Sequence, residues 1–544
     1  MKSNTSKPFS YLIGGIDGSL DASDAEIFKK TADRMKRMGI SSVPLHFRLY
    51  KRSVDARKKE NVKFVYTVLA ELDRPLSNAI CKKNGVRQLV ESEPIHPTGT
   101  ERMAKPPLVV GMGPAGLFAA LLLARNGYEP ILIDRGDSVE DRVRTVERFR
   151  ESGVLDTESN VQFGAGGAGT FSDGKLVTRI HDPYSREVLQ TFCQFGAPKE
   201  LLLLAKPHIG TDVLRGVVSA MIREIERLGG TVLYRCRMDD FSEQSDGTLL
   251  VHTSKGEISC GAMILAIGHS SRDTYAKLIE KSYAIEPKPI SVGVRAEHLQ
   301  EDLDRALYGR FAGHPRLGHA EYALSDTKGD RGVYTFCMCP GGEVVAAASE
   351  VGGLVVNGMS NHARDGKNAN AAVLVSIGCE EYQAVNGSRA LGAIEFQRRI
   401  ERAAFRVGGS DYRAPVMTVG DLLNGKRGTE PSRICPSYRD ARVTVADFAD
   451  VFPSFVISSL QYAIRSFGRS IVGYDAQDAV LTAAETRTSA PLRILRSGET
   501  YTALGHSLVY PCGEGAGYAG GITSAAVDGL HVAEAIMRRF APLH

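Results

Sequence analysis

The sequence predicts an α/β protein built from more than one domain, with a parallel sheet at its centre. Three observations predict this fold. Residues 108–134 read as a strand, a glycine turn, a helix and a second strand in succession. A second glycine-rich loop, 512–522, leads into a helix near the end of the sequence. A proline-rich stretch at 91–107 separates both from a small α/β region that comes first.

The length of 544 residues predicts two or three domains, and the composition is that of a folded chain. Hydrophobic residues make up 43% and charged residues 24%. The longest apolar run, Leu117–Ala124, is far shorter than the roughly 20 residues that a membrane-spanning helix needs. No signal peptide is recognisable. Nine cysteines without a C-x-x-C motif favour free thiols, no bound metal and a cytoplasmic location.

The N-terminal region, residues 1–100, carries a positive charge of its own. It holds 18 Lys or Arg against 11 Asp or Glu. A helix is predicted over Ala22–Met38, and strands over Val43–Tyr50 and Asn61–Leu72. The basic run 50–59 falls between these strands and contains one aromatic residue. A solvated hairpin, or a dock onto the acidic remainder of the chain, is therefore favoured over contact with RNA.

The unit at 108–134 matches a dinucleotide-binding βαβ unit at every position that the chemistry needs. Its strands are Leu108–Val110 and Ile131–Ile133, with an apolar helix between them. Asp134, followed by Arg135, closes the second strand and is placed to accept hydrogen bonds from ribose hydroxyls.

The turn of this unit supplies the phosphate site. Gly111 permits the tight turn, Gly113 lets the backbone approach a diphosphate, and Gly116 allows close packing of helix on strand. The helix begins at Pro114 and Ala115, where its dipole and free N–H groups favour an anion. These residues predict a dinucleotide site.

The loop at 512–522 suggests where the other end of the ligand binds. Two glycine-lined helix starts far apart in sequence suit a long ligand with one end at each, which favours FAD over NAD. Glu514 is placed to bind a ribityl hydroxyl, and the helix predicted over 523–539 would face the flavin pyrimidine ring. A flexible entry into a terminal helix is the alternative. The predicted contacts are Gly513, Glu514, Gly520, Gly521 and Ile522.

Further strands are predicted to extend the same sheet. A helix over Thr211–Leu228 is followed by strands over Thr231–Arg237 and Ala262–Ile267. Because ligands of parallel sheets lie at the carboxyl ends of the strands, Met238 and Gly268 are predicted to pass close to the cofactor.

Residues 163–175 form a third glycine-rich loop. It fits the pattern G-x-x-x-x-G-K but lacks the Ser or Thr that must follow the lysine of a P-loop, so an NTPase is not predicted. Gly166 and Gly167 are predicted along the cofactor diphosphate, and Ser172 and Lys175 near flavin N5. A solvated turn is the alternative for the last two.

Together these motifs resemble known flavoproteins. GMGPAGLFAALLLARNG…ILIDRG and GEGAGYAGGITSAAVDG resemble the paired FAD motifs of glutathione-reductase-type flavoproteins. KRSVDARKK, NVQFGAGGAGTFSDGKL, HIGTD, ILAIGHSSRDT, TFCMCPGG and ETRTSAP resemble a bacterial and plastid family of FAD-dependent dehydrogenases, over nearly the whole chain. That family pattern leads us to expect an acidic residue in the FGxGGAG loop, where this sequence has Ala165.

The resemblance implies non-covalent FAD, a Rossmann-like domain of the glutathione-reductase type, an inserted mixed α+β domain and a small N-terminal α/β domain. It implies no substrate. The predicted boundaries are 1–100 for the N-terminal domain and its linker, 101–285 and 495–544 for the two parts of the FAD domain, and 286–494 for the inserted domain.

Three side chains are candidates for catalysis. Arg487 is suited to bidentate binding of a substrate carboxylate, and Glu485 to orienting it or moving a proton. Lys175 is the third candidate. An internal ion pair is the alternative reading of Glu485 and Arg487.

Two further clusters favour structural readings. Cys337 and Cys339 are interpreted as buried thiols on one face of a strand rather than a redox pair. Arg295, Glu297 and His298 are interpreted as a surface cluster at the end of a strand.

The sequence therefore predicts an FAD-dependent oxidoreductase of the dehydrogenase type, which transfers a hydride between a small-molecule substrate and flavin N5. Transient use of NAD(P)H is compatible with this prediction, whereas membrane or nucleic-acid partners are not expected. An FAD-dependent RNA-modifying enzyme and a non-catalytic redox-sensing flavoprotein are the alternatives. The oligomeric state is not predicted.

Overall fold

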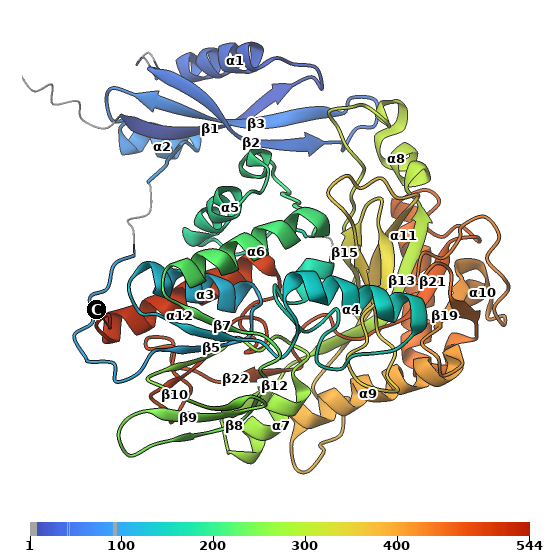
Figure 1. Ribbon diagram of the computed structural model, residues 1–544. Helices are drawn as coiled ribbons and strands as arrows, with labels where there is room; N and C mark the ends of the chain where they lie inside the picture. Colours follow the sequence, from blue (N-terminus) through green and yellow to red (C-terminus); the bar gives the residue numbers. More distant parts are fainter. Residues whose placement is uncertain (1–7, 41, 43, 91–94, 173, 544) are drawn as a thin grey trace, which may run out of the picture. The chain divides into compact units, whose positions relative to one another are not determined.

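The computed structural model describes residues 8–40, 42, 44–90, 95–172 and 174–543, which adopt a mixed α/β fold (Figure 1). The chain divides into two compact units. Unit 1 takes Met1–Pro94, Pro198–Pro207 and Asp304–Ala320, and unit 2 takes Ile95–Ala197, His208–Leu303 and Glu321–His544. Part of the predicted linker, 91–94, lies outside the described residues, and the predicted domain boundaries stay predictions. No helix in the described ranges combines the length and apolar character needed to cross a membrane.

Unit 1 is built on a four-stranded antiparallel sheet with strand order β2-β3-β1-β4. Helix α1 begins at a capping box between Ser23 and Glu26, and it buries Ile27 and Met35 in the core that the sheet supplies. The elements of this unit that precede residue 94 are β1 (Phe9–Gly18), α1 (Asp24–Arg37), β2 (His46–Asp55), β3 (Lys63–Leu72), α2 (Asn78–Asn84) and β4 (Arg87–Gln88).

Two expectations for unit 1 need correction. The sequence pattern does not predict β1, because Gly14 and Gly15 interrupt the strand and the register with β3 shifts there. The strand predicted over Val43–Tyr50 instead runs as β2 to Asp55. The first half of the basic run is therefore strand rather than hairpin loop, because a register shift at Leu49 lets β2 continue its pairing with β3.

The first sheet of unit 2 is parallel, with strand order β23-β11-β5-β6-β7. Its strands are β5 (Leu108–Val110), β6 (Ile131–Ile133), β7 (Thr231–Leu233), β11 (Met263–Leu265) and β23 (Val509–Pro511). The βαβ unit predicted from the sequence is confirmed, with β5 and β6 correct to the residue. The strand predicted to reach Arg237 ends earlier, because Arg235 takes a left-handed backbone conformation with φ of 50°.

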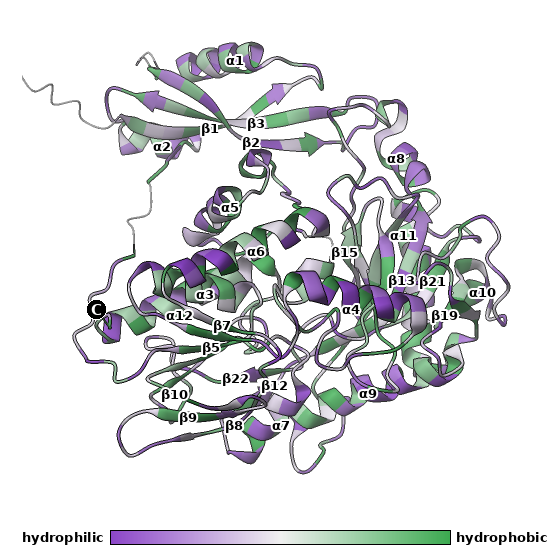
Figure 2. Ribbon diagram, in the orientation of Figure 1, coloured by the Kyte–Doolittle hydropathy of each residue, from purple (hydrophilic) through white to green (hydrophobic). Residues whose placement is uncertain are grey.

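Helices α3 (Pro114–Arg125), α6 (Thr211–Arg227) and α12 (Ile522–Arg539) accompany this sheet, and α3 packs against both α12 and α6 (Figure 1). Every residue of α3 from Ala115 to Ala124 is buried. Figure 2 shows the contrast with α4 (Val139–Ser152), whose side chains are mostly hydrophilic. An all-apolar helix is the expected neighbour of a sheet that is covered on both faces.

The second sheet of unit 2 has seven strands in the order β14-β15-β18-β13-β21-β19-β20. Helices α9 (Arg389–Gly408) and α11 (Ser454–Ser470) pack against its strands. The strands are β13 (Ile290–Leu299), β14 (Ser325–Asp326), β15 (Val333–Cys339), β18 (Asn368–Ile377), β19 (Ala414–Thr418), β20 (Val443–Val445) and β21 (Val480–Glu485).

The predicted surface cluster of Arg295, Glu297 and His298 is wrong. All three side chains are buried, at 0%, 0% and 4% exposure. They lie on β13, which is the central strand of the seven and pairs with β18 and β21 along its length. A strand with neighbours on both sides has no exposed edge, and those neighbours come from sequence 70 to 190 residues away.

The remaining elements complete the described residues. They are α5 (Tyr184–Gln194), α7 (Arg272–Glu280), α8 (Gln300–Tyr308), α10 (Val419–Asn424), η1 (Ala168–Phe171), η2 (Lys199–Leu202), η3 (Gly309–Phe311), η4 (Phe448–Asp450), a sheet of β8 (Met238–Glu243), β9 (Leu249–Thr253) and β10 (Gly256–Cys260), and the pairs β12 (Ile285–Pro287) with β22 (Leu492–Ile494) and β16 (Glu343–Ala346) with β17 (Val356–Met359).

Candidate functional site

A cavity of about 340 Å³ opens at the carboxyl ends of the parallel strands, where Val110, Ile133 and Ala266 border it. This edge of a parallel sheet is where such folds bind their ligands. The predicted contacts that line it are Gly111, Gly113, Pro114, Ala115, Asp134, Arg135, Gly167, Ser172, Met238, Gly268, Glu514, Gly520, Gly521 and Ile522. The catalytic candidates Lys175, Glu485 and Arg487 line it too.

Three predicted contacts, Gly116, Gly166 and Gly513, do not line the cavity but adjoin residues that do. Their role is packing. A β-carbon on Gly116 would lie 1.9 Å from Gly111 O, and one on Gly166 would lie 2.2 Å from a Thr170 methyl carbon. Only glycine allows the backbone to approach so closely.

The start of α3 presents its backbone to the cavity. Gly113 is the N-cap of the helix, and no side chain caps the first turn. A β-carbon on Gly167 would lie 2.9 Å from Gly113 Cα, so the third glycine loop passes directly against the first. Free N–H groups at a helix start, walled by glycines, form a cradle that fits a diphosphate.

Asp134 does more than line the cavity. Its carboxylate accepts hydrogen bonds from the backbone N–H of Met112 and of Gly136, each at 2.9 Å, and so stabilises the first glycine turn. Arg135 beside it is paired with Glu158 and Asp273. The predicted role of Asp134 toward ribose hydroxyls stays a prediction.

The buried side chain of Arg142 of α4, which the sequence analysis did not single out, holds the third glycine loop by hydrogen bonds. Its side chain is 0% exposed. The guanidinium donates to carbonyl oxygens and to one hydroxyl of the loop, and burial lowers its pKa to about 9, so it remains charged at neutral pH. The acceptors are Asn160 O, Val161 O, Gly164 O, Ala165 O, Gly167 O and Thr170 Oγ1, at 2.7–3.2 Å.

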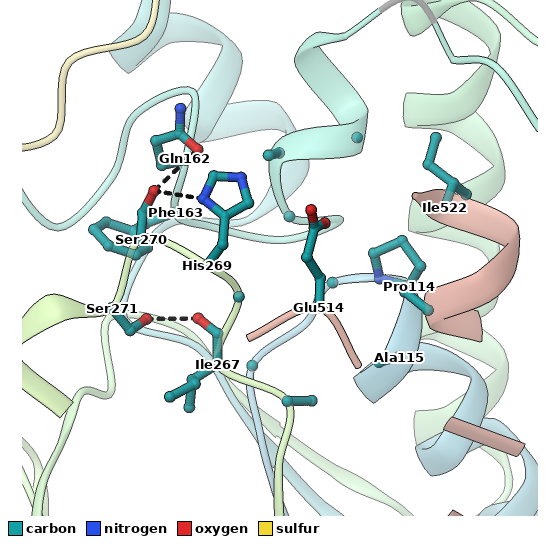
Figure 3. Close-up of a pocket in the computed structure, with 18 of the residues that line it drawn as sticks. Pro114, Ala115, Gln162, Phe163, Ile267, His269, Ser270, Ser271, Glu514 and Ile522 are labelled. Atoms are coloured by element: carbon teal, nitrogen blue, oxygen red, sulfur yellow. Dashed lines mark hydrogen bonds between the residues drawn. The ribbon is translucent and has the colours of Figure 1, made fainter. Parts of the chain in front are cut away.

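The terminal glycine loop is held by Asp528 of α12. Its carboxylate accepts a 2.7 Å hydrogen bond from the N–H of Gly513 and a bidentate pair from Arg496. Figure 3 shows Glu514 projecting into the cavity. Burial raises the pKa of Glu514 to about 7, although Lys288 opposes the shift. Ligand hydroxyl groups that donate hydrogen bonds to this buried carboxylate would compensate for its lost hydration.

His269 lines the cavity but was not among the predicted contacts, which included only its neighbour Gly268. Its Nδ1 lies 3.0 Å from Ser270 Oγ, which donates to Gln162 Oε1 at 3.3 Å (Figure 3). Burial, followed by the charges of Arg487 and Arg272, lowers the pKa of His269 to about 4. The imidazole is therefore neutral at pH 7.

Glu485 and Arg487 do not bind each other, which corrects the expectation that Glu485 orients Arg487. Glu485 forms a bidentate pair with Arg295, and burial raises its pKa while Arg295 opposes the shift. Arg487 pairs with Glu401 of α9 through Nε and Nη2. Arg487 lies two residues beyond the end of β21 at Glu485, and the two side chains have partners on different elements, Arg295 of β13 and Glu401 of α9.

Glu401 is the centre of a buried ion cluster behind the cavity wall. Besides Arg487 it binds Arg272, the first residue of α7, at 2.8 Å, and both arginines are 2% exposed at the side chain. Glu350 binds Arg272 and Arg398 at the rim of the cluster. Arg487 therefore takes part in an internal ion pair, as the alternative interpretation proposed, and its partner is Glu401.

Lys175 and Cys337 complete the same end of the cavity. The Lys175 ammonium donates to Met338 O and lies 3.9 Å from Glu321. Cys337 takes φ of 44° where the register of β15 shifts, and its carbonyl accepts a 2.8 Å hydrogen bond from Arg295. All nine cysteines are free thiols. The described residues contain no group of three or more His, Cys, Asp or Glu arranged to hold a metal ion.

Comparison with known proteins bears on the cofactor. A model of the family described as "FAD-dependent protein, C-terminal domain-like" matches residues 289–488, and a model of a "Domain of unknown function (DUF8436)" matches residues 16–71. A protein of Clostridium beijerinckii (strain ATCC 51743 / NCIMB 8052), described as "Uncharacterized protein", is 45% identical over 533 residues, which cover 96% of this chain and 97% of that protein. The first match confirms the predicted cofactor, FAD.

Solved structures with partial likeness include CtdE in complex with FAD, at 12% identity over 80% of this chain and 84% of that chain, with a TM-score of 0.30. The halogenase PltM is 10% identical over 80% of this chain and 68% of that chain, with a TM-score of 0.38. TM-scores this low carry no argument about the activity of this chain.

Proposed function

The chain belongs to the same family as the Clostridium beijerinckii protein, which it matches over 96% of its own residues. We propose that it is an FAD-dependent oxidoreductase of the dehydrogenase type. It transfers a hydride between a small-molecule substrate and flavin N5, with NAD(P)H as a transient electron donor or NAD(P)+ as a transient acceptor. A cytoplasmic location is in keeping with nine free thiols.

One observation carries the proposal. The starts of α3 and α12 lie about 400 residues apart in sequence, yet Gly113–Ala115 and Gly520–Ile522 line one cavity. Two helix N-termini, each opened by glycine, suit a ligand that carries phosphate at one point and gains negative charge at another. This supports a Rossmann-like FAD domain of the glutathione-reductase type, with the seven-stranded sheet in an inserted domain.

The residues would divide the cofactor among them. Gly111, Gly113, Pro114 and Ala115 hold the diphosphate, with Gly167 opposite, and Gly166 lets the backbone of that loop pack closely. Asp134, Arg135, Met238 and Gly268 serve the adenosine half. Glu514 accepts ribityl hydroxyls, and the start of α12 at Gly521 and Ile522 faces the pyrimidine ring. When bound, the flavin supplies the hydride acceptor or donor.

The substrate would bind at the end of the cavity lined by Lys175, Cys337 and Glu485. The Lys175 side chain reaches Met338 O there, while the Arg295 pair keeps Glu485 in place. Lys175 is therefore the strongest of the three catalytic candidates for direct contact with substrate. Arg487 binds Glu401 and stabilises the cavity wall.

The test begins with the purified protein. Flavin released by denaturation should be FAD in a ratio near one per chain, because the site is built for a non-covalent dinucleotide. Anaerobic mixing with panels of reductants should bleach the flavin absorbance. Lys175→Met should keep the flavin and slow reduction by the true substrate at least tenfold. Purification without flavin, under conditions that retain folding, would overturn the proposal.

One observation favours the RNA-modifying alternative. The three segments of unit 1 contain 23 Lys or Arg and 13 Asp or Glu, whereas those of unit 2 contain 44 and 50. A basic unit attached to an acidic one suits a polyanion partner. Salt-dependent co-purification with RNA would support this alternative. If no RNA co-purifies at low salt, the alternative is wrong and the proposal of a small-molecule substrate stands.

A further inference from the structure

A second, separate cavity of about 240 Å³ lies on the other side of η1 from the cofactor site. Ala168 and Gly169 of η1 line the first cavity, and Phe171 of the same turn lines the second. Most of the second cavity is apolar. Its aliphatic and aromatic lining residues are Val143, Val146, Phe149, Val161, Phe171, Val344, Val345, Ala346 and Met359.

Arg215 of α6 brings a cationic side chain into this apolar lining. Its Nε donates a long 3.4 Å hydrogen bond to Thr170 O, and its guanidinium carbon lies 4.4 Å from the centre of the Phe171 ring. Its two terminal amino groups donate no hydrogen bond to any residue that the structure describes. Such a half-buried, unused guanidinium edge is the geometry that binds a carboxylate bidentately.

The charged side chains of the lining leave a net positive charge, although Glu147 acts on Arg215. The lining holds Arg150, Arg215 and Arg439 against Glu147 and Glu343. Arg150 is paired with Asp440 and Glu343. Arg439 is buried and donates to backbone carbonyl oxygens only. An anionic head group would therefore lower the electrostatic free energy of this cavity.

The volume sets the size of the occupant. A cavity of about 150 Å³ holds a six-carbon ring, so one of this size accommodates about ten non-hydrogen atoms. Apolar walls and a cationic edge select a ligand with one anionic end and one hydrocarbon end. We propose that this cavity is a binding site for a small organic carboxylate with an apolar tail, whose carboxylate pairs with Arg215 and whose tail packs between α4 and β16.

Calorimetric titration of the flavin-loaded protein with octanoate, octanol and octylamine tests the proposal without requiring turnover. Octanoate has the size and charge that the cavity selects. Octanoate should bind at least tenfold more tightly than octanol, because the alcohol lacks the ionic hydrogen bonds, and octylamine should not bind. Equal affinity for acid and alcohol, or no heat with octanoate, would overturn it.

Variants locate the site. Arg215→Gln should weaken octanoate binding at least tenfold, whereas Arg227→Gln, on the exposed end of the same helix, should not, since Arg227 is occupied by Glu224. Val146→Phe should abolish binding by filling the cavity while leaving every charge in place. The Val146→Phe result decides the matter if Arg215→Gln does not fold, and unchanged octanoate affinity in Val146→Phe would refute the assignment.

Discussion

Arg142 lies directly against Gly164: a β-carbon at Gly164 would come within 2.5 Å of Arg142 Cδ. This contact lets the guanidinium pass under the third glycine loop and reach the carbonyl oxygens of Ala165 and Gly167. Among the described residues it has no carboxylate partner. A single buried cation thus shapes one wall of the cavity through hydrogen bonds to five backbone carbonyl oxygens and one hydroxyl.

Arg142→Lys should therefore be far from conservative. A lysine keeps the charge but cannot supply the forked donors, so several buried carbonyl groups lose their partners. We expect the free energy of unfolding to fall by about 3 kcal/mol and FAD affinity to fall with it. Denaturant unfolding and FAD titration measure the two effects. Arg144→Lys, on the exposed side of α4, is the control and should change neither.

The two glycines of the first turn should behave differently. A β-carbon at Gly113 would have 3.8 Å to its nearest neighbour, whereas one at Gly116 would collide with Gly111 O. Gly113→Val should fold with a side chain in the cavity and lose FAD. Gly116→Ala should lose stability by several kcal/mol, on the order of an overpacked core. Flavin content and thermal unfolding separate the two outcomes, and a yellow Gly113→Val would contradict the cavity assignment.

Glu514 makes the stability of the flavin-free protein depend on pH. Its folded pKa of about 7 exceeds the ordinary value of 4.5, so the folded state holds an extra proton between these values. Stability from this group is full below about pH 4.5 and is lost as pH rises to 7, by roughly 3 kcal/mol in total. Unfolding experiments on apoprotein across this range should show the loss. Glu514→Gln should flatten it, and a slope that survives the substitution would assign it to another group.

Glu401 should be the least replaceable residue of α9. Burial opposes its charge, but Arg272 and Arg487 hold its pKa well below the usual range. Glu401→Gln leaves two buried guanidinium groups without their carboxylate and should cost about 3–5 kcal/mol. Glu395→Gln, which removes a carboxylate on the same helix whose arginine partners are exposed, should cost less than about 1 kcal/mol. If Glu401→Gln lowers the free energy of unfolding as little as Glu395→Gln does, Arg272 and Arg487 must find other partners.

The sequence alone predicts those parts of the site in which chemistry and local structure coincide. At Gly111–Gly116 the turn, the helix start and the predicted phosphate contact all need the same residues, so the sequence pattern indicates all three. The same holds for Glu514 and the glycines before α12. The local sequence of these segments is enough to determine their conformation.

Residues that depend on distant partners are harder to predict. Arg142 and Asp528 hold loops that are 15 or more residues away, and each sits on a helix where a charge is ordinarily read as exposed. One signal was available for Arg142: it continues the buried stripe of Val139, Thr145 and Phe149. Nothing local could reveal that Arg295 is interior, because β18 and β21 bury it.

The pairing of β23 with β11 has a consequence for biosynthesis. The loop after β23 and the first turn of α12 line the cavity, and a ribosome adds them more than 370 residues after β6. A nascent chain that already contains the whole βαβ unit still lacks this wall of its pocket. Prosthetic-group loading must therefore wait until these residues have been made, and chains that stop before residue 509 would be released colourless.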